Sequence, residues 1–110
     1  MNWLGVLAAL SGALAIGAGA FGAHGAAEQA RELLKTGGQY QLVHAVAALA
    51  ALGMGARGPA WLFVIGAALF AGSLYALAEG APRLIGAVTP VGGLLMIAGW
   101  MWLAWMLARR

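Results

Sequence analysis

The sequence contains no cysteine and very few charged residues. The missing thiol excludes disulfide bonds, thiolate metal ligands and a cysteine nucleophile. Only 8% of the residues are charged and 64% are hydrophobic, against roughly 25% and 45–50% in soluble domains. Such a chain has too little polar surface to cover a water-soluble globule, so we expect it to lie among membrane lipids. The six basic residues form no patch and have no interleaved aromatics, which argues against a nucleic-acid partner.

Long stretches without charge fill the chain, and short breaks rich in glycine, proline or charge separate them. Each stretch supplies the ~20 apolar residues that an α-helix needs to cross a ~30 Å hydrocarbon core. We therefore predict an all-α fold, a single integral membrane bundle of four transmembrane helices over residues 1–110. The helices are expected at about 3–23, 39–56, 60–79 and 84–108. The first stretch lacks the basic residues that begin a secretory signal, so we expect it to be a span.

Four spans would place both termini on one membrane surface, here called the B side, together with the loop 57–59. The opposite surface, the A side, would hold the loops 24–38 and 80–83. Three basic residues fall on each side, so the positive-inside rule gives no orientation. The acidic residues all fall near the A side, which favours cytoplasmic termini.

The first predicted loop contains the segment EQARELLK, residues 28–35. Glu28 with Arg31 and Glu32 with Lys35 are spaced to pair on one face of a helix. The segment is therefore expected to be either a short helix on the A surface or a solvated loop.

Small residues recur at every fourth position within the spans, as in Ser11–Ala15–Gly19–Ala23 and Ala68–Gly72–Ala76. Such rows let helix backbones approach closely in lipid, where no hydrophobic effect drives helices together. We predict helix-packing roles for five glycines: Gly19, Gly22, Gly72, Gly92 and Gly93.

Hydrogen-bonding side chains gather in the A-side half of the predicted spans, with Ser11 as the exception. The stretch QYQLVH (39–44) opens the second span, and Gln41 and His44 share the face that carries small residues. They are therefore expected to point inward, as polar groups in a membrane usually do. The predicted polar layer, a candidate ligand site, comprises His24, Tyr40, Gln41, His44, Ser73, Tyr75, Thr89 and Pro90.

The fourth predicted span contains Thr89–Pro90 near its start. A proline inside a helix loses a hydrogen bond and clashes with the preceding turn, which predicts a kink. Thr followed by Pro also suits a helix start, in which case the preceding residues form an irregular lead-in. Either arrangement leaves free backbone carbonyls beside the polar layer.

Two interpretations of the polar layer stay open: a hydrogen-bonded cluster that fixes helix register, or a site for a ligand, ion or proton. Two histidines from neighbouring helices would be the minimum for a haem, but no attachment motif accompanies them, and we expect no cofactor and no metal. No nucleophile–base pair, phosphate loop or pair of carboxylates is present, so we expect no enzymatic activity.

Four stretches resemble the signatures of a small family of four-span membrane proteins: GAFGAHG (19–25), QYQLVHA (39–45), FAGSLYAL (70–77) and IGAVTPVGGLLMIAGW (85–100). The family is catalogued as domain of unknown function 423, and its animal relatives are called transmembrane protein 256. The resemblance implies a multi-pass protein of the bacterial inner membrane and no particular function. Glu79 departs from the pattern, which expects a small or neutral polar residue before the glycine.

These observations favour a small accessory or interaction protein that packs with itself or with a larger membrane complex. The alternative is a homo-oligomeric transporter or channel, or a protein that binds a lipid or quinone, using the polar layer. Small multidrug transporters have a similar length and span number but place a carboxylate inside the first span, and here the first carboxylate is Glu28.

Overall fold

The computed structural model describes all 110 residues, and nearly all of them are helical. The helices are α1 (Trp3–His24), α2 (Glu28–Gly53), α3 (Arg57–Ala78) and α4 (Val88–Ala108), with a short 3-10 helix η1 (Arg83–Ala87) before α4. The side chain of Asn2 caps α1 by accepting a hydrogen bond from the backbone N–H of Gly5 at 2.9 Å. Gly55 and Gly80 adopt positive φ in the turns after α2 and α3, a conformation that glycine takes without strain.

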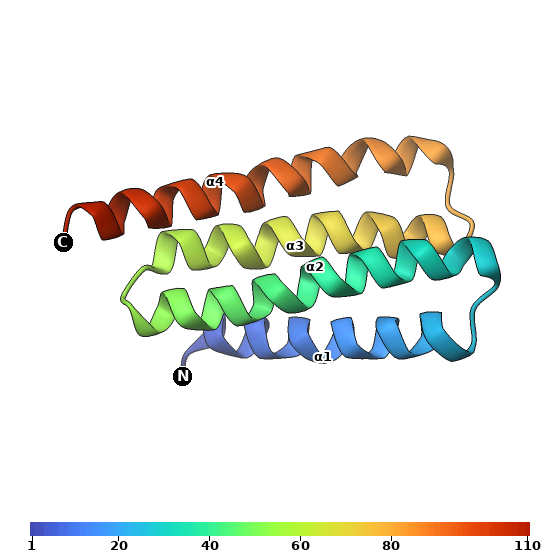
Figure 1. The fold of residues 1–110 in the computed structure, drawn as a ribbon, viewed down its shortest axis with the longest axis horizontal. Coiled ribbons are helices and arrows are strands. Elements are labelled where there is room, and N and C mark those ends of the chain that lie inside the picture. The colour runs from blue at the N-terminus through green and yellow to red at the C-terminus, as the bar shows by residue number, and fades with distance from the viewer.

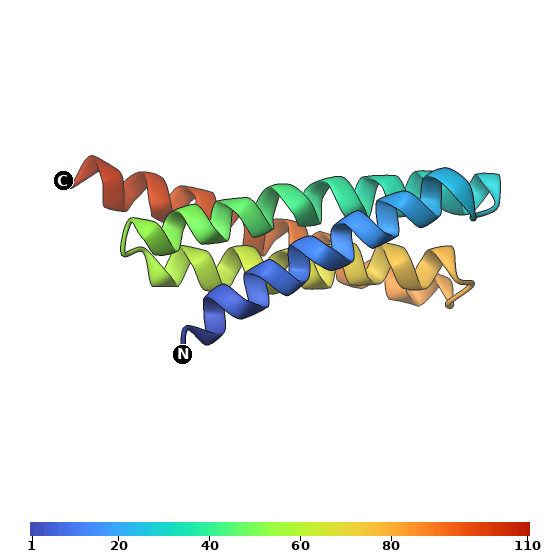
Figure 2. The same cartoon turned by 90° about the horizontal axis from the view of Figure 1, so that it is seen from below.

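The helices form three layers, with α2 and α3 side by side in the middle (Figures 1 and 2). α4 packs along α3 on one side of this layer, and α1 packs mainly along α2 on the other. Both chain termini lie at the end of the molecule that also holds the α2–α3 turn. The termini and the α2–α3 turn therefore lie together at one end, as predicted for the B side, and the other two connections lie at the opposite end, as predicted for the A side (Figure 1).

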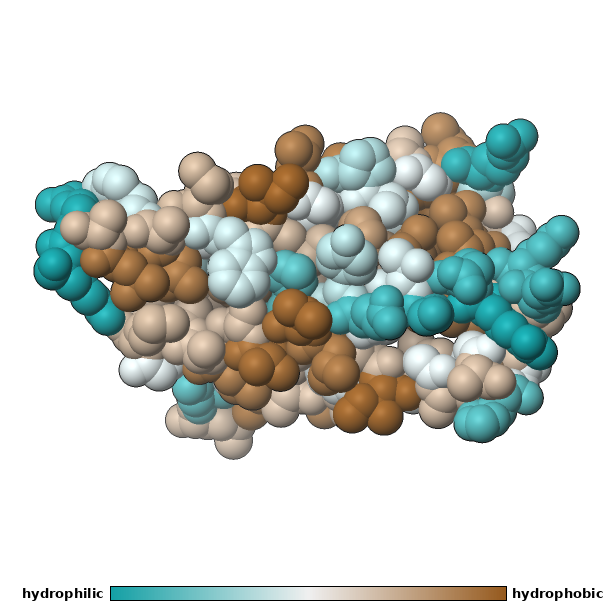
Figure 3. Space-filling model, viewed as in Figure 1, coloured by the Kyte–Doolittle hydropathy of each residue, from teal (hydrophilic) through white to brown (hydrophobic).

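Three helical segments are long and apolar enough to cross a membrane: Trp3–His24, Arg57–Ala78 and Arg83–Ala108. α2 does not qualify, so the predicted count of four spans is not confirmed. Hydrophilic residues lie at both ends of the molecule, and a hydrophilic strip also runs from one end along the N-terminal half of α2 (Figure 3). That strip explains why α2 does not qualify as a span, because its polar residues lower the mean hydropathy of α2.

The predicted start of the second helix at residue 39 is wrong, since α2 begins at Glu28. The segment 28–35 is neither a separate surface helix nor a loop; it forms the first turns of α2, as its helix-forming Glu, Gln, Ala, Leu, Arg and Lys residues favour. Gly37 and Gly38 do not break the helix, because neighbours pack against both. A Cβ added at Gly38 would lie 3.0 Å from the carbonyl oxygen of Ala15, and one at Gly37 would lie 2.7 Å from the Tyr75 ring.

The chain before α4 is irregular, as one of the two alternatives at Thr89–Pro90 expects. η1 covers residues 83–87, and α4 begins at Val88, two residues before the proline. Pro90 thus lies in the first turn of α4, where a backbone N–H has no partner within the helix and its absence is harmless. A kink at Pro90 stays a prediction.

The hydrophobic core lies towards the B-side end of the molecule, where Leu4 and Ala8 of α1 contact the α2–α3 layer. Leu4 and Phe63 are fully buried there. From this end α1 crosses the layer obliquely and finishes over α2 (Figure 2). The A-side half of α1 is therefore separated from α3.

Candidate functional site

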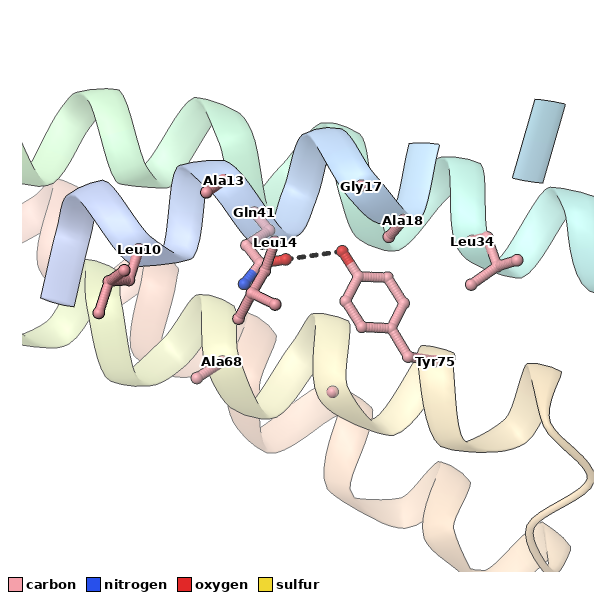
Figure 4. A pocket seen from close by; sticks show the side chains of 10 residues that line it. Leu10, Ala13, Leu14, Gly17, Ala18, Leu34, Gln41, Ala68 and Tyr75 are labelled. Atoms are coloured by element: carbon pink, nitrogen blue, oxygen red, sulfur yellow. Dashed lines mark hydrogen bonds between the residues drawn. The ribbon is translucent and has the colours of Figure 1, made fainter. Parts of the chain in front are cut away.

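A cavity of about 760 Å³ lies between α1 and α3, with α2 as its floor. Ten residues line it, and seven of them are hydrophobic. Leu10 and Leu14 of α1 form one wall, Ala68 and Gly72 of α3 form the other, and Gln41 of α2 lies between them (Figure 4). We call this cavity the α1–α3 cleft.

The cleft stays open because its walls carry small side chains. A Cβ added at Gly17 of α1 or at Gly72 of α3 would meet no atom within 4 Å. The row Ala68–Gly72–Ala76, predicted for helix packing, thus has no partner within the chain at Gly72. Gly72 is a wall of a cavity instead of a contact between helices.

One hydrogen-bonded group, the Ser11–Gln41–Tyr75 triad, joins α1, α2 and α3. The Gln41 side-chain amide donates to the hydroxyl of Ser11 at 3.0 Å, and the Tyr75 hydroxyl donates to the amide oxygen of Gln41 at 2.7 Å. The Tyr75 ring reaches across from α3 to make this contact (Figure 4). Gln41 lines the cleft and is only 4% exposed, so the triad is nearly enclosed by the protein.

His44 lies in a second group, which faces α4. Its Nε2 atom is 3.0 Å from the indole Nε1 of Trp100, and its Nδ1 atom is 2.7 Å from the carbonyl oxygen of Tyr40. An indole N–H only donates and a carbonyl oxygen only accepts, so the partners require a neutral ring with the proton on Nδ1. The Phe63 ring contacts both His44 and Trp100, with ring centres 5.6 and 4.8 Å away.

Ser73 and Thr89 form a third group between α3 and α4. The Ser73 hydroxyl donates to the carbonyl oxygen of Phe70 at 2.8 Å, and its oxygen lies next to the Thr89 hydroxyl. Because Ser73 has a single proton to give, Thr89 is the donor in their contact.

The predicted polar layer is thus three separate groups, and the side chains of some of its members hydrogen-bond in none of them. His24 is exposed at the end of α1 and is not brought to His44. Tyr40 is 49% exposed, and its ring packs on Phe70 with ring centres 4.9 Å apart. Pro90 is exposed at the start of α4. The wall of the cleft carries no charged residue, so its chemistry is hydrogen bonding and apolar contact.

The predicted packing glycines also divide. A Cβ at Gly22 would lie 3.1 Å from the Cβ of Leu34, and one at Gly92 would lie 2.6 Å from the carbonyl oxygen of Gly66. Gly19 and Gly72 have open space at that position, and Gly93 has only an ordinary contact with Phe70.

Sequence reasoning missed two partners in these groups. Ser11 was set apart as an exception, yet it binds Gln41, and Trp100 was not among the predicted site residues, yet its N–H binds His44. The helix bounds explain the first miss. With α2 beginning at Glu28, Gln41 lies near the middle of the helix, level with the middle of α1.

Comparisons with known proteins place the chain among relatives of unknown function. The profile of a family described as "Protein of unknown function (DUF423)" matches residues 18–93. A UPF0382 membrane protein of Staphylococcus saprophyticus is 37% identical, with 89% of this chain and 90% of that protein covered. The UPF0382 inner membrane protein YgdD of Escherichia coli K12 is 41% identical, with 86% and 81% covered. No solved structure matches the chain.

Proposed function

Because the chain belongs to the DUF423 family, for which no function is established, we propose a function from geometry: it is an integral membrane protein that binds an uncharged, membrane-soluble molecule in the α1–α3 cleft. The observation that carries this proposal is the cleft itself. A volume of about 760 Å³ is within the range of pockets that hold small ligands, roughly 300–1,000 Å³. Its apolar walls with two polar side chains, Gln41 and Tyr75, also have the composition of such pockets.

The position of the cleft determines how a ligand would arrive. Both walls belong to helices that are apolar enough to span a membrane. The opening between them therefore faces the hydrocarbon of the bilayer, and a ligand enters sideways from lipid. Charged or strongly polar molecules do not dissolve there, which restricts the ligand to an apolar one.

We propose further that α2 spans the membrane together with the other three helices. It lies between α1 and α3 along the molecule (Figures 1 and 2), and its polar residues Gln41 and His44 are buried against neighbouring helices. The name of the Escherichia coli relative supports an inner-membrane location, and we keep the prediction that the termini are cytoplasmic.

The span count is tested with two matched variants, Glu28→Cys and Glu79→Cys, in a chain that has no other cysteine. Both glutamates are exposed. Four spans put them on the same membrane surface, and three spans put them on opposite surfaces. A membrane-impermeant maleimide applied to inverted and to right-side-out vesicles should label both variants in the same preparation; labelling in opposite preparations would refute a spanning α2.

Ligand binding is tested by filling the cleft. The full-length protein in lipid nanodiscs is photolabelled with a diazirine-bearing alkylbenzene, and labelled peptides are identified by mass spectrometry. Gly17→Leu and Gly72→Leu place a side chain in the cleft from opposite walls without meeting another atom at Cβ. Both should reduce labelling of α1 and α3 several-fold. Gly53→Leu is the matched control, because Gly53 also has open space around it but lies at the far end of α2.

A second candidate function is assembly with copies of itself or with a larger membrane complex. It is favoured by how little of the outer helices is buried within the chain. Only 22% of an apolar 18-residue stretch of α1 is buried, and 17% of such a stretch in Arg83–Ala108, which contains α4, against 44% in α3. A transport role would also require an oligomer, since α1 and α4 lie on opposite sides of the α2–α3 layer and do not close a ring with it (Figure 1). Native mass spectrometry of gently extracted protein should give a defined oligomer or complex; a monomer alone would contradict assembly.

A further inference from the structure

The ligand of the α1–α3 cleft can be specified from the hydrogen-bonding capacity of the cleft wall. We propose that it is a quinone-like molecule dissolved in the bilayer core, which presents a carbonyl oxygen to the side-chain amide of Gln41. This step rests on the proposed function, because it assumes that the cleft is occupied.

Gln41 has a donor that the protein does not use. Its amide nitrogen carries two hydrogens, and one of them is given to Ser11. The amide makes one further contact, in which its oxygen accepts from Tyr75. Gln41 is 96% buried, since only 4% of it is exposed, and it lines the cleft. The second N–H has no partner within the protein, and the cleft that Gln41 lines is the side from which a molecule can reach it.

This count does not depend on which way the amide is turned. Ser11 and Tyr75 both carry hydroxyls that can donate or accept, so exchanging the amide nitrogen and oxygen preserves both contacts. In either orientation the nitrogen faces one hydroxyl and keeps one hydrogen free. A free N–H in a membrane has no water to bind, which favours a ligand that brings an acceptor oxygen.

Two kinds of membrane molecule could supply such an oxygen, a phospholipid ester or a quinone, and they reach different depths in the bilayer. Ser11 and Gln41 lie near the middles of α1 and α2, and so near the centre of a hydrocarbon core about 30 Å thick. The ester carbonyls of phospholipids are anchored at the membrane surface, about half that thickness away. A quinone is not anchored, and its ring can reach the centre. An apolar ring with carbonyl oxygens also fits a cleft that has hydrophobic walls and one free donor.

The test compares two competitors with the same decyl chain on a six-membered ring: decylbenzoquinone, whose ring carries two carbonyl groups, and decylbenzene, whose ring carries none. Each competes with the photoreactive alkylbenzene for the full-length protein in nanodiscs of ether-linked phospholipid, which has no ester carbonyl. We expect the quinone to compete about tenfold better, the effect of one net neutral hydrogen bond. Gln41→Met should remove this preference. Gln39→Met is the matched control and should keep it, because Gln39 is exposed on the same helix and does not line the cleft.

Each other outcome overturns a different step. Equal competition by the two compounds in the unmodified protein refutes the carbonyl inference while binding in the cleft stands, and this comparison needs no variant to fold. If labelling is insensitive to both competitors and to Gly72→Leu, the proposed function itself fails. Loss of the quinone preference in nanodiscs of ester-linked phospholipid would assign the site to an anchored lipid ester.

Discussion

Small residues have opposite roles where α3 faces α4 and where it faces α1. On the face that carries α4, glycines bring backbones into contact: a Cβ at Gly92 would lie 2.6 Å from the carbonyl oxygen of Gly66, and one at Gly99 would lie 2.8 Å from the Phe63 ring. On the face that carries α1, Gly38 of α2 also lies close to the α1 backbone, but Gly17 and Gly72, which line the α1–α3 cleft, have nothing within 4 Å. The same residue type closes the α3–α4 interface and keeps the space between α1 and α3 open.

The difference suggests a division of roles between the faces. Close approach of helix backbones is a main source of stability in lipid, because van der Waals packing replaces the hydrophobic effect there. The α4 face is thus expected to supply stability, and the α1 face to supply space for a ligand. Variants of matched residues on the two faces test that division.

The largest expected effect is that of Gly92→Ala. The added Cβ would meet the backbone of Gly66 and Phe70, which cannot move aside as a flexible side chain can. We expect a loss of about 1–3 kcal/mol of unfolding free energy, the usual cost of overpacking. The measurement is unfolding in detergent micelles, followed by circular dichroism.

Gly72→Ala is the control for this prediction. It places the same methyl group in open space, so stability should be unchanged or slightly higher, because alanine favours a helix more than glycine does. If the two variants unfold alike, the faces are not different in the way that we describe.

His44→Ala should have the next largest effect, and on stability alone. Both ring nitrogens of His44 are bonded away from the cleft, to Tyr40 and Trp100. Single hydrogen bonds between helices in a membrane contribute about 0.6 kcal/mol on average and up to about 1.7. We expect a loss in that range, with photolabelling of the cleft unchanged.

Trp100→Phe removes the other partner of the same bond. The double variant His44→Ala with Trp100→Phe should therefore lose less stability than the two single losses added together. Loss of cleft labelling in His44→Ala would show instead that His44 belongs to the ligand site and that the two faces are coupled.

The helical fold was predictable from the sequence because its causes are local. Stretches without charge and breaks at Arg57–Pro59 and Glu79–Arg83 located most helix ends to within a few residues. The exception was the start of α2. Two consecutive glycines, such as Gly37 and Gly38, are typical of a helix break. Only the close packing of Ala15 and Tyr75 against them keeps them within a continuous helix. That approach depends on tertiary packing, which composition does not contain.

The candidate site was predictable only in part, for a related reason. The face shared by Gln41 and His44 indicated that both side chains point inward, and both are buried. Their partners required the depth and direction of neighbouring helices. The two residues are three positions apart, yet one binds α1 and α3 and the other binds α4. The cleft itself comes from the oblique crossing of α1 (Figure 2), for which the sequence pattern gave no signal.

The smallest expected effect is that of Thr89→Val, which probes whether hydrogen bonding contributes to the α4 face. The variant removes the proton that Thr89 donates to Ser73 and nearly preserves its shape, and Ser73 keeps its own bond to the carbonyl oxygen of Phe70. We expect a loss of about 0.6 kcal/mol, the average for such bonds, measured by the same unfolding assay. Gly92→Ala should lower the unfolding free energy more than Thr89→Val does. Comparing the two variants therefore shows whether backbone packing or hydrogen bonding contributes more to the α3–α4 interface. A larger loss for Thr89→Val would mean that the Ser73–Thr89 contact, and not the close approach of backbones, holds α4 to α3.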